Sequence, residues 1–349
     1  MDGTGLDERV EAFDYPEAWA VIAEHPAPVR DASRLLVYDR RAARVEHRRF
    51  RDLPEYGVAG DVLVVNDSRV IPARLDGLKT PSGGRLELLL VRREAPGVWS
   101  VLARGKVRPG QRLEFAEGGE GEILEPDVHG RVRVRVTPDD PAWLERVGRV
   151  PLPPYIAKAR GTDAGWVEDR ARYQTVYARA NGSVAAPTAG LHFTDSVFDG
   201  LARRGVRRAA VTLHVGPGTF EPVRSDRVED HRMAGEWGEV SAETSAVVNR
   251  ARQAGGRVIA VGTTATRVLE TAAADGALRP FQGETDLFIR PGHHWRVVDA
   301  LLTNFHLPRS TPLLLAAALC GRSVLLELYR EAAAEGYRFY SYGDAMLIL

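Results

Sequence analysis

The sequence predicts an α/β protein with a discontinuous, barrel-like core that is interrupted by an inserted small all-β barrel domain. Apolar, strand-like runs alternate with helix-like runs over most of the second half of the chain, which is typical of an α/β core. The segment before them contains only short strand-like runs. The chain of 349 residues also exceeds the usual size of one domain. We therefore assign residues 1–68 and 155–349 to the core and residues 69–154 to the inserted barrel.

The barrel is predicted from four short runs of strand-forming residues, at 85–91, 98–103, 111–115 and 131–136. Glycine clusters separate these runs at intervals that are typical of a small closed barrel.

The core elements follow from apolar runs and from the capping residues beside them. Strand-like runs at 209–215 and 257–261 lead into polar loops. Ser241 can cap a helix that ends near Gly255, and Ser310 can cap one that ends near Gly321. Residues 323–334 predict another helix. A terminal strand within 337–349 brings the C-terminus back to the core.

Five polar tracts lack any helical or strand period, so the burial of one face does not explain their residues. They are 181–194, 212–220, 261–264 with Arg267, 303–308 and 340–346. Several follow a strand and precede a helix, and an α/β core gathers such loops into one site. The alternative for each tract alone is an ordinary loop. The candidate binding residues within the tracts are Ser183, Pro187, Thr188, Gly190, Gly216, Gly218, Thr219, Gly262, Thr263, Thr264, Asn304 and Tyr342.

Composition restricts the class of protein. One cysteine, Cys320, excludes an internal disulfide and a cysteine-based metal cluster. The chain has no four-ligand Cys/His spacing and no early G-x-G-x-x-G, so neither a metal site nor a methyltransferase-type Rossmann site is indicated. The apolar run 313–320 is too short to cross a bilayer, and the acidic N-terminus does not resemble a signal peptide. We expect a cytoplasmic protein without a membrane partner.

A net charge of zero means that any surface for nucleic acid is local. Residues 69–154 contain 15 basic and 12 acidic residues. Two alternating triplets, Arg104, Lys106 and Arg108 and then Arg131, Arg133 and Arg135, place three cations on one face of a strand. The alternative is a solvated face that is balanced by the glutamates of 114–125.

From about residue 30 to the C-terminus, the chain resembles the S-adenosylmethionine:tRNA ribosyltransferase-isomerases of queuosine biosynthesis. The resemblance lies in the five tracts and in 30–36, 60–66, 151–156 and 173–177. It implies that S-adenosylmethionine is a co-substrate, without a metal, and that its ribosyl group is transferred to 7-aminomethyl-7-deazaguanine at the tRNA wobble position. The implied product is epoxyqueuosine, and adenine and methionine leave. The implied fold is the interrupted α/β core described above.

This chemistry needs a base for the C5′ proton, a neutral amine, stabilisation of departing adenine and exclusion of water. Histidine is the usual proton-transfer group near neutrality, and the candidates are His192, His214, His231 and His306. We favour His192 and His306 because they lie on loops, although the identity of the base stays open. His214, within an apolar run, has a structural alternative.

Charged candidates complete the expected site. Asp286 and Asp344 are suited to ribose hydroxyls or to a guanine-like edge, and Arg267 is suited to the methionine carboxylate. The amides of Gly262 and Thr263 at a helix start are an alternative for that carboxylate. Arg267 has a structural alternative in Glu270, and Asp344 has one as a turn residue.

The chain departs from the family pattern at three places, which keeps two other hypotheses open. After residues 230–233, Ala234 replaces a usual histidine, and the segments 13–17 and 291–295 also differ. One alternative is a paralogue that uses the same donor chemistry on a small-molecule amine. The other is a catalytically silent RNA- or nucleotide-binding module. The oligomeric state is open, with a monomer favoured.

Overall fold

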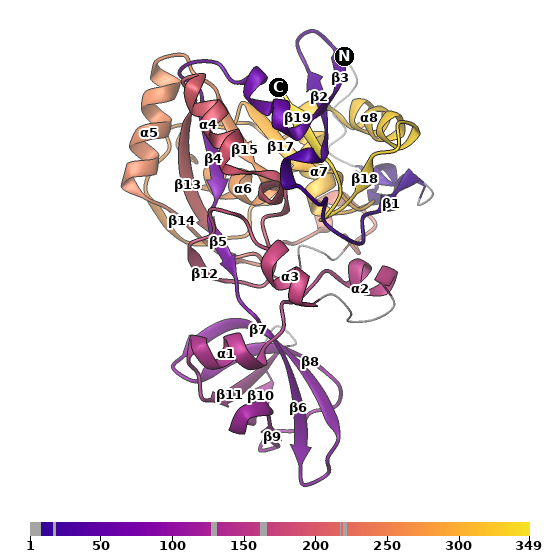
Figure 1. The fold of residues 1–349 in the computed structure, drawn as a ribbon, viewed down its shortest axis with the longest axis vertical. Coiled ribbons are helices and arrows are strands. Elements are labelled where there is room, and N and C mark those ends of the chain that lie inside the picture. Colours follow the sequence, from indigo (N-terminus) through magenta and orange to yellow (C-terminus); the bar gives the residue numbers. More distant parts are fainter. Residues whose placement is uncertain (1–7, 17–18, 127–130, 161–165, 217, 219–221) are drawn as a thin grey trace.

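The computed structural model describes residues 8–16, 19–126, 131–160, 166–216, 218 and 222–349. These residues form an α/β core with a β-barrel attached to one side of it (Figure 1). Both parts agree with the fold class that the sequence predicts.

The core contains one mixed sheet of nine strands with two ends, so closure is confined to the inserted barrel among the described residues. Strand β4 precedes the barrel in sequence and pairs in parallel with β13 and β15, which follow the barrel. The core is therefore discontinuous, as expected. In spatial order the strands are β16 (Phe281–Thr285), β14 (Glu236–Val240), β13 (Arg207–Leu213), β4 (Val62–Asn66), β15 (Val258–Val261), β17 (Ala300–Asn304), β19 (Ala345–Ile348), β2 (Arg34–Asp39) and β3 (Arg44–Arg49).

The central strands are buried along their whole length because helices cover the sheet. These helices are α4 (Asp195–Arg203), α5 (Ala242–Gln253), α6 (Gly262–Ala272), α7 (Thr311–Cys320) and α8 (Arg322–Ala334). The caps follow the sequence prediction: Ser241 accepts a hydrogen bond from the Thr244 amide and Ser310 accepts one from the Leu313 amide. Helix α7 ends at Gly321, which has a φ of 90°.

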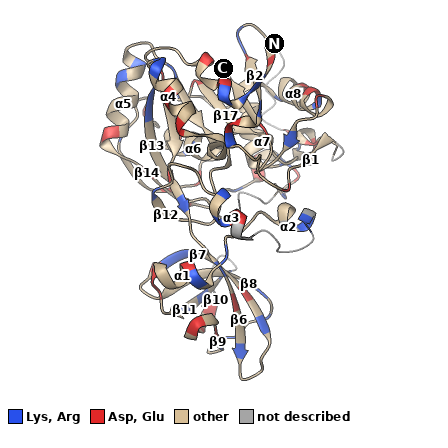
Figure 2. Cartoon of the chain, viewed as in Figure 1, with Lys and Arg blue, Asp and Glu red and all other residues tan. Residues whose placement is uncertain are grey.

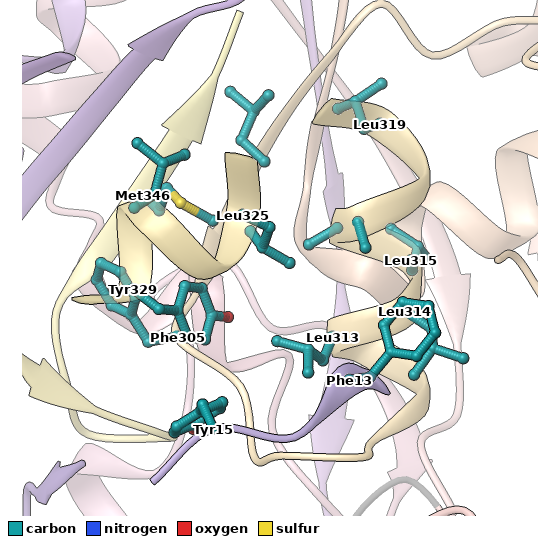
Figure 3. Close-up of a cluster of buried hydrophobic side chains, with 14 of the residues drawn as sticks. Phe13, Tyr15, Phe305, Leu313, Leu314, Leu315, Leu319, Leu325, Tyr329 and Met346 are labelled. Carbon is teal, nitrogen blue, oxygen red and sulfur yellow. The ribbon is translucent and has the colours of Figure 1, made fainter. Parts of the chain in front are cut away.

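Helix α7 is apolar on all sides because it is packed inside the core. Figure 3 shows Leu313, Leu314 and Leu315 of α7 among aromatic side chains such as Phe13 and Phe305. No single helix of the described residues is long and apolar enough to span a membrane; α7 and α8 pass that test only as a pair, bent by 110°.

Shorter elements connect these layers. Strand β1 (Val21–Ile22) pairs with β18 (Arg338–Phe339), and β5 (Ser68–Val70) pairs with β12 (Ala180–Ser183). Among the described residues, the other short helices of the core are η1 (Val10–Phe13), η3 (Arg30–Ala32), η4 (Phe50–Tyr56), α2 (Pro154–Arg160), α3 (Trp166–Arg172), η6 (Thr188–His192) and η8 (Val228–Asp230).

The barrel is closed and has its own apolar core. Its hydrogen-bond order is β10–β11–β8–β7–β6–β9. All four predicted strands are present, whereas β6, β10 and α1 were not predicted from the sequence. The elements are β6 (Arg74–Thr80), β7 (Arg85–Ala95), β8 (Val98–Arg104), β9 (Arg112–Glu114), η5 (Ala116–Gly118), β10 (Glu120–Pro126), β11 (Val132–Thr137) and α1 (Pro141–Val147).

Glycine explains why two barrel strands were missed. Gly77 lies within β6 and Gly121 within β10, where glycine usually indicates a turn. A Cβ at either position would lie within 3 Å of the Phe115 ring. Both glycines therefore make room for an aromatic side chain rather than for a turn.

Candidate active site

All five polar tracts contribute to one small cavity beside the ends of β15 and β17. Its volume is about 60 Å³. The tract residues that line it are Ala186, Pro187, Thr188, Ala189, Val215, Gly262, Thr263, Thr264, Thr303, Asn304, Phe305, His306, Leu307, Tyr340 and Ser341. We call it the inner cavity. The prediction that the α/β core gathers these loops agrees with this arrangement.

Among the described residues, His306 is the one histidine that lines the inner cavity. Its Nε2 lies 2.6 Å from Thr303 Oγ1, and its Nδ1 has no partner among the described residues. Its backbone is held from both sides, because its amide donates to Tyr329 Oη and its carbonyl accepts from Tyr15 Oη. Burial lowers the pKa of His306 to about 3, so the ring is neutral near pH 7.

His192 lies behind the inner cavity rather than in its wall. Its Nδ1 is 2.8 Å from Ser33 Oγ, and its Nε2 is 3.2 Å from Asn304 Nδ2. Burial lowers its pKa to about 3, with a smaller contribution from Arg338 and Arg30. A neutral ring accepts the Asn304 amide hydrogen at Nε2 and donates from Nδ1. His192 thereby orients the Asn304 amide.

Asn304 lines the inner cavity and connects it to His192. Its Nδ2 also lies 3.2 Å from the Tyr340 carbonyl oxygen. Its Oδ1 is buried and has no hydrogen-bond partner in the described part of the chain. A buried acceptor without a partner is costly, so this oxygen is suited to a donor on a ligand.

A second, larger cavity of about 920 Å³ lies between the barrel and the core. We call it the interdomain cavity. It shares Val215 with the inner cavity, so the two adjoin. Of the predicted site residues, Gly216, Gly218, His214 and His231 line it. Thr219 lies outside the described residues.

His214 stacks on Trp237 in the wall of the interdomain cavity. The ring centroids are 5.2 Å apart at an interplanar angle of 17°. On its other side, His214 meets Gly182, where a Cβ would lie 3.0 Å from the imidazole and where φ is 140°. Its Nδ1 is buried without a partner, and burial lowers its pKa. Its polar edge is therefore not satisfied by the described chain, unlike that of an ordinary structural histidine.

His231 lies farther along the same cavity wall. Its ring contacts Phe288 edge to face at 5.0 Å, and burial lowers its pKa. The four histidines are therefore divided between the two cavities and the layer behind the inner one.

Arg267 is bound inside the protein by partners that the sequence did not indicate. Its Nη1 donates to Glu236, and its Nε and Nη2 donate to the carbonyls of Leu287 and Thr285 at 2.9 and 3.0 Å. The other carboxylate oxygen of Glu236 accepts the Gly216 amide at 2.7 Å. The predicted alternative, an ion pair between Arg267 and Glu270, is wrong. The Glu270 carboxylate accepts the amides of residues 296–298 and lies 3.3 Å from His293.

The two aspartates differ in their surroundings. Asp344 is buried, and its carboxylate accepts the backbone amides of Arg34 and Arg338, each at 2.8 Å. It therefore joins the start of β2 to β18 instead of acting as an isolated turn residue. Asp286 is exposed after β16 and lines neither cavity.

Three further candidates serve packing in this structure. Ser183 donates to the Ala185 carbonyl and accepts the Val215 amide. Tyr342 donates to Asp169 at 2.8 Å. Gly190 leaves room for Tyr177, whose Oη would lie 2.0 Å from an added Cβ.

Sequence inspection missed Tyr155, Ser310 and Trp237 as cavity residues. Tyr155 lies within the family-like motif 151–156 and hydrogen-bonds to Ser341, so the motif gave a usable signal. Ser310 was assigned only a capping role. Trp237 lies on β14, in a stretch without a polar tract.

Helix α6 presents its N-terminus to the inner cavity. Gly262, Thr263 and Thr264 line this cavity, and no side chain caps the helix. The first amides of a helix lack partners within it, and the helix dipole there favours negative charge. No group of three or more His, Cys, Asp or Glu residues in the described ranges is arranged to hold a metal.

Comparison with known proteins gives consistent full-length matches. A family model described as queuosine biosynthesis protein matches residues 10–348. The chain is 52% identical over 349 residues to the S-adenosylmethionine:tRNA ribosyltransferase-isomerase of Anaeromyxobacter dehalogenans strain 2CP-C, covering 98% of this chain and 99% of that protein. The protein of the same name from Symbiobacterium thermophilum is 49% identical over 347 residues, with 98% and 100% covered.

A solved structure is also similar. The crystal structure of the S-adenosylmethionine tRNA ribosyltransferase from Thermotoga maritima is 37% identical in sequence and has a TM-score of 0.55. The match covers 97% of this chain and 100% of that one.

Proposed function

Because the chain belongs to the queuosine biosynthesis protein family, we propose that it modifies tRNA as an S-adenosylmethionine:tRNA ribosyltransferase-isomerase. The enzyme transfers and isomerises the ribosyl group of S-adenosylmethionine onto 7-aminomethyl-7-deazaguanine at the wobble position of queuosine-type tRNAs. The products are epoxyqueuosine, adenine and methionine. The observation that carries this proposal is the convergence of all five family-like tracts on the inner cavity, which adjoins the interdomain cavity.

The two cavities suit two substrates. The interdomain cavity, at about 920 Å³, is large enough for a nucleotide drawn out of an RNA loop. The stacked His214 and Trp237 give it an aromatic wall, and nucleobases bind to such surfaces. The reacting ribosyl carbons belong where the two cavities meet at Val215.

His306 is the proposed base for the C5′ proton. It lines the inner cavity, is neutral near pH 7 and has an Nδ1 without a partner in the described chain. When Nε2–H donates to Thr303, Nδ1 carries the lone pair that accepts a proton. His192 acts indirectly, as a positioning residue for Asn304.

The methionine carboxylate is proposed to bind the amides of Gly262 and Thr263. This alternative is preferred over Arg267 because the Arg267 guanidinium already binds Glu236 and two carbonyls. The uncapped start of α6 offers partners to an anion. Arg267 supports the site through Glu236, which holds the Gly216 amide.

Ala234 is the feature that favours the small-molecule alternative. It is exposed and lines the interdomain cavity, where the acceptor would bind. Against that alternative, full-length relatives that are about half identical to the chain bear the tRNA-modifying name. We propose that Ala234 is a tolerated replacement and that the protein acts in the cytoplasm as a monomer.

Adenine release from S-adenosylmethionine tests the function directly. The purified protein is incubated with the donor, with and without tRNA that carries the aminomethyl precursor base, and products are separated by chromatography. We expect adenine and methionine only when the tRNA is present. Release with a small amine alone would establish the paralogue instead. Donor binding without release would support the silent module, and Ala234→His would then be the next variant to measure.

A further inference from the structure

At the end of the barrel away from the core, β6, β7, β8 and the loop after β8 carry five cations that lack a carboxylate partner among the described residues. Strand β6 ends and β7 begins at this end, and β8 ends there too. The ammonium group of Lys79 donates to the Lys106 carbonyl at 2.6 Å, which joins the loops. We call this group the distal cation cluster, and it consists of Lys79, Arg85, Arg104, Lys106 and Arg108. Figure 2 shows Lys and Arg at this end of β6 and β8.

Elsewhere on the barrel, arginines are largely neutralised. Arg133 binds Glu94 and Glu125, and Arg135 binds Glu122. Two of the three arginines in the second predicted basic stripe therefore have the balanced, solvated character that was its alternative, whereas Arg131 lines the interdomain cavity. Further ion pairs of the barrel include Arg74–Glu87, Arg93–Asp139, Arg146–Glu117 and Arg149–Asp76.

Acidic neighbours of the cluster are already engaged. Glu87 lies opposite Arg104 in the ladder, but its carboxylate is bound to Arg74. Glu114 accepts a hydrogen bond from Thr80 Oγ1 at 3.0 Å. Neither carboxylate forms an ion pair with a cation of the cluster, which stays positively charged in a protein whose net charge is zero.

The cluster continues a surface that begins at the interdomain cavity. Leu102 of β8 lines that cavity, and Arg104 lies two residues farther along the same strand. Side chains two residues apart leave the same face of a strand. Strand β7 runs back from Arg85 at the cluster to Arg92, which also lines the cavity.

We propose that the distal cation cluster binds the phosphate backbone of the tRNA stem whose loop enters the interdomain cavity. This inference rests on the proposed function, because it requires tRNA as the substrate. A hairpin loop in the cavity leaves its stem outside, and the barrel extends from the cavity away from the core (Figure 1). Exposed cations that contact phosphates provide affinity and register without reading the sequence.

The test compares two variants that each remove three positive charges from the barrel. One is Arg104→Gln with Lys106→Gln and Arg108→Gln. The matched control is Arg133→Gln with Arg135→Gln and Arg146→Gln, three arginines that bind glutamates. The dissociation constant of an unmodified tRNA transcript with a queuosine-type anticodon is measured at several salt concentrations.

We expect the salt dependence of tRNA binding to be weaker for the cluster variant than for the wild-type protein, and to be unchanged in the control variant. Each lost phosphate contact lowers the slope of log affinity against log salt by about 0.9. If the cluster variant has lost three phosphate contacts, an increase in salt from about 50 to 200 mM weakens tRNA binding by the wild-type protein about 40-fold more than binding by the variant. At saturating tRNA, adenine release should keep its rate, because the cluster lines neither cavity.

A second RNA separates stem from loop. On an anticodon hairpin with a shortened stem, the difference between wild type and cluster variant should disappear. An equal difference on the short hairpin would place the contact in the loop and overturn the inference, as would a cluster variant with the wild-type slope. If the wild-type protein neither binds tRNA nor releases adenine with it, the proposed function itself fails.

Discussion

At the scale of single residues, burial decides what the two favoured histidines can do. His192 and His306 have the same lowered pKa, about 3, yet only His306 lines the inner cavity. The sequence indicated both, because both lie in polar tracts. It does not tell which one faces the cavity, since the partners Ser33 and Asn304 of His192 are 159 and 112 residues away in the chain.

Replacement of His306 by alanine should slow the chemical step. We expect His306→Ala to reduce single-turnover adenine release by about 10²–10⁴-fold, which is typical of a lost proton-transfer group. Binding of S-adenosylmethionine, measured by calorimetry, should survive. His47→Ala is the control, because His47 lies on β3 outside both cavities. Turnover at the wild-type rate in His306→Ala would remove His306 from the mechanism.

The buried histidines should also make folding sensitive to acid. Their pKa is about 3 in the folded protein and 6.5 as the ordinary value. Between these pH values the unfolded chain binds more protons than the folded protein does. The contribution of each histidine to the free energy of unfolding is therefore fully present above pH 6.5 and is lost as the pH falls towards 3. Each histidine contributes at most about 1.4 kcal/mol per pH unit. Urea unfolding across this range should show a smaller slope for His192→Gln than for wild type. Equal slopes would show that His192 does not titrate in this way.

At the scale of elements, caps were predictable but tight packing was not. Ser241, Ser310 and Gly321 end or begin their helices as predicted, because capping depends on neighbouring residues. The partners of Arg267 were not predictable, since Glu236 is 31 residues away in the chain and on another element. The barrel strands β6 and β10 were missed for the same reason, a contact between residues distant in sequence. Gly77 and Gly121 make room for the Phe115 ring.

Helix α6 should depend on a close approach to β14. A Cβ on Gly238 would lie 2.3 Å from Val268 Cγ2 on α6. Gly238→Ala should therefore displace the helix that presents Gly262 and Thr263 to the inner cavity, and should destabilise the protein by about 1–3 kcal/mol, as overpacking does. Donor affinity should fall with it. Both effects can be measured by thermal unfolding and by calorimetry.

Gly283→Ala is the matched control for this prediction. Gly283 pairs directly with Gly238 in the sheet, and its Cβ would make only an ordinary contact, at 3.6 Å from Phe281. We expect near-wild-type stability and donor affinity. Equal effects from the two substitutions would mean that strand propensity, not the contact with α6, sets the cost.

At the scale of the whole molecule, the sequence predicted two parts, but it gave no view of the cavity between them. The barrel has an apolar core of its own, and its short strand-like runs with glycine clusters between them were enough to predict it. The interdomain cavity depends on how distant residues meet, such as Arg92 of β7 and Glu284 of β16, whose side chains form an ion pair at 2.8 Å. Both side chains are 57% exposed, so this pair contributes little to stability.

Removal of the barrel should separate folding of the core from use of tRNA. The chain enters and leaves the barrel at one place, because Arg74 and Arg149 exchange backbone hydrogen bonds of 3.0 and 2.9 Å. A short Gly-rich link can therefore replace residues 74–149. The nine-stranded sheet receives no strand from the barrel, so the shortened protein should still unfold cooperatively and keep the inner cavity. It should lose tRNA-dependent adenine release, because the interdomain cavity loses one wall. Circular dichroism, thermal unfolding and the adenine assay measure these outcomes. Release at the full-length rate would show that the barrel does not help to hold the acceptor.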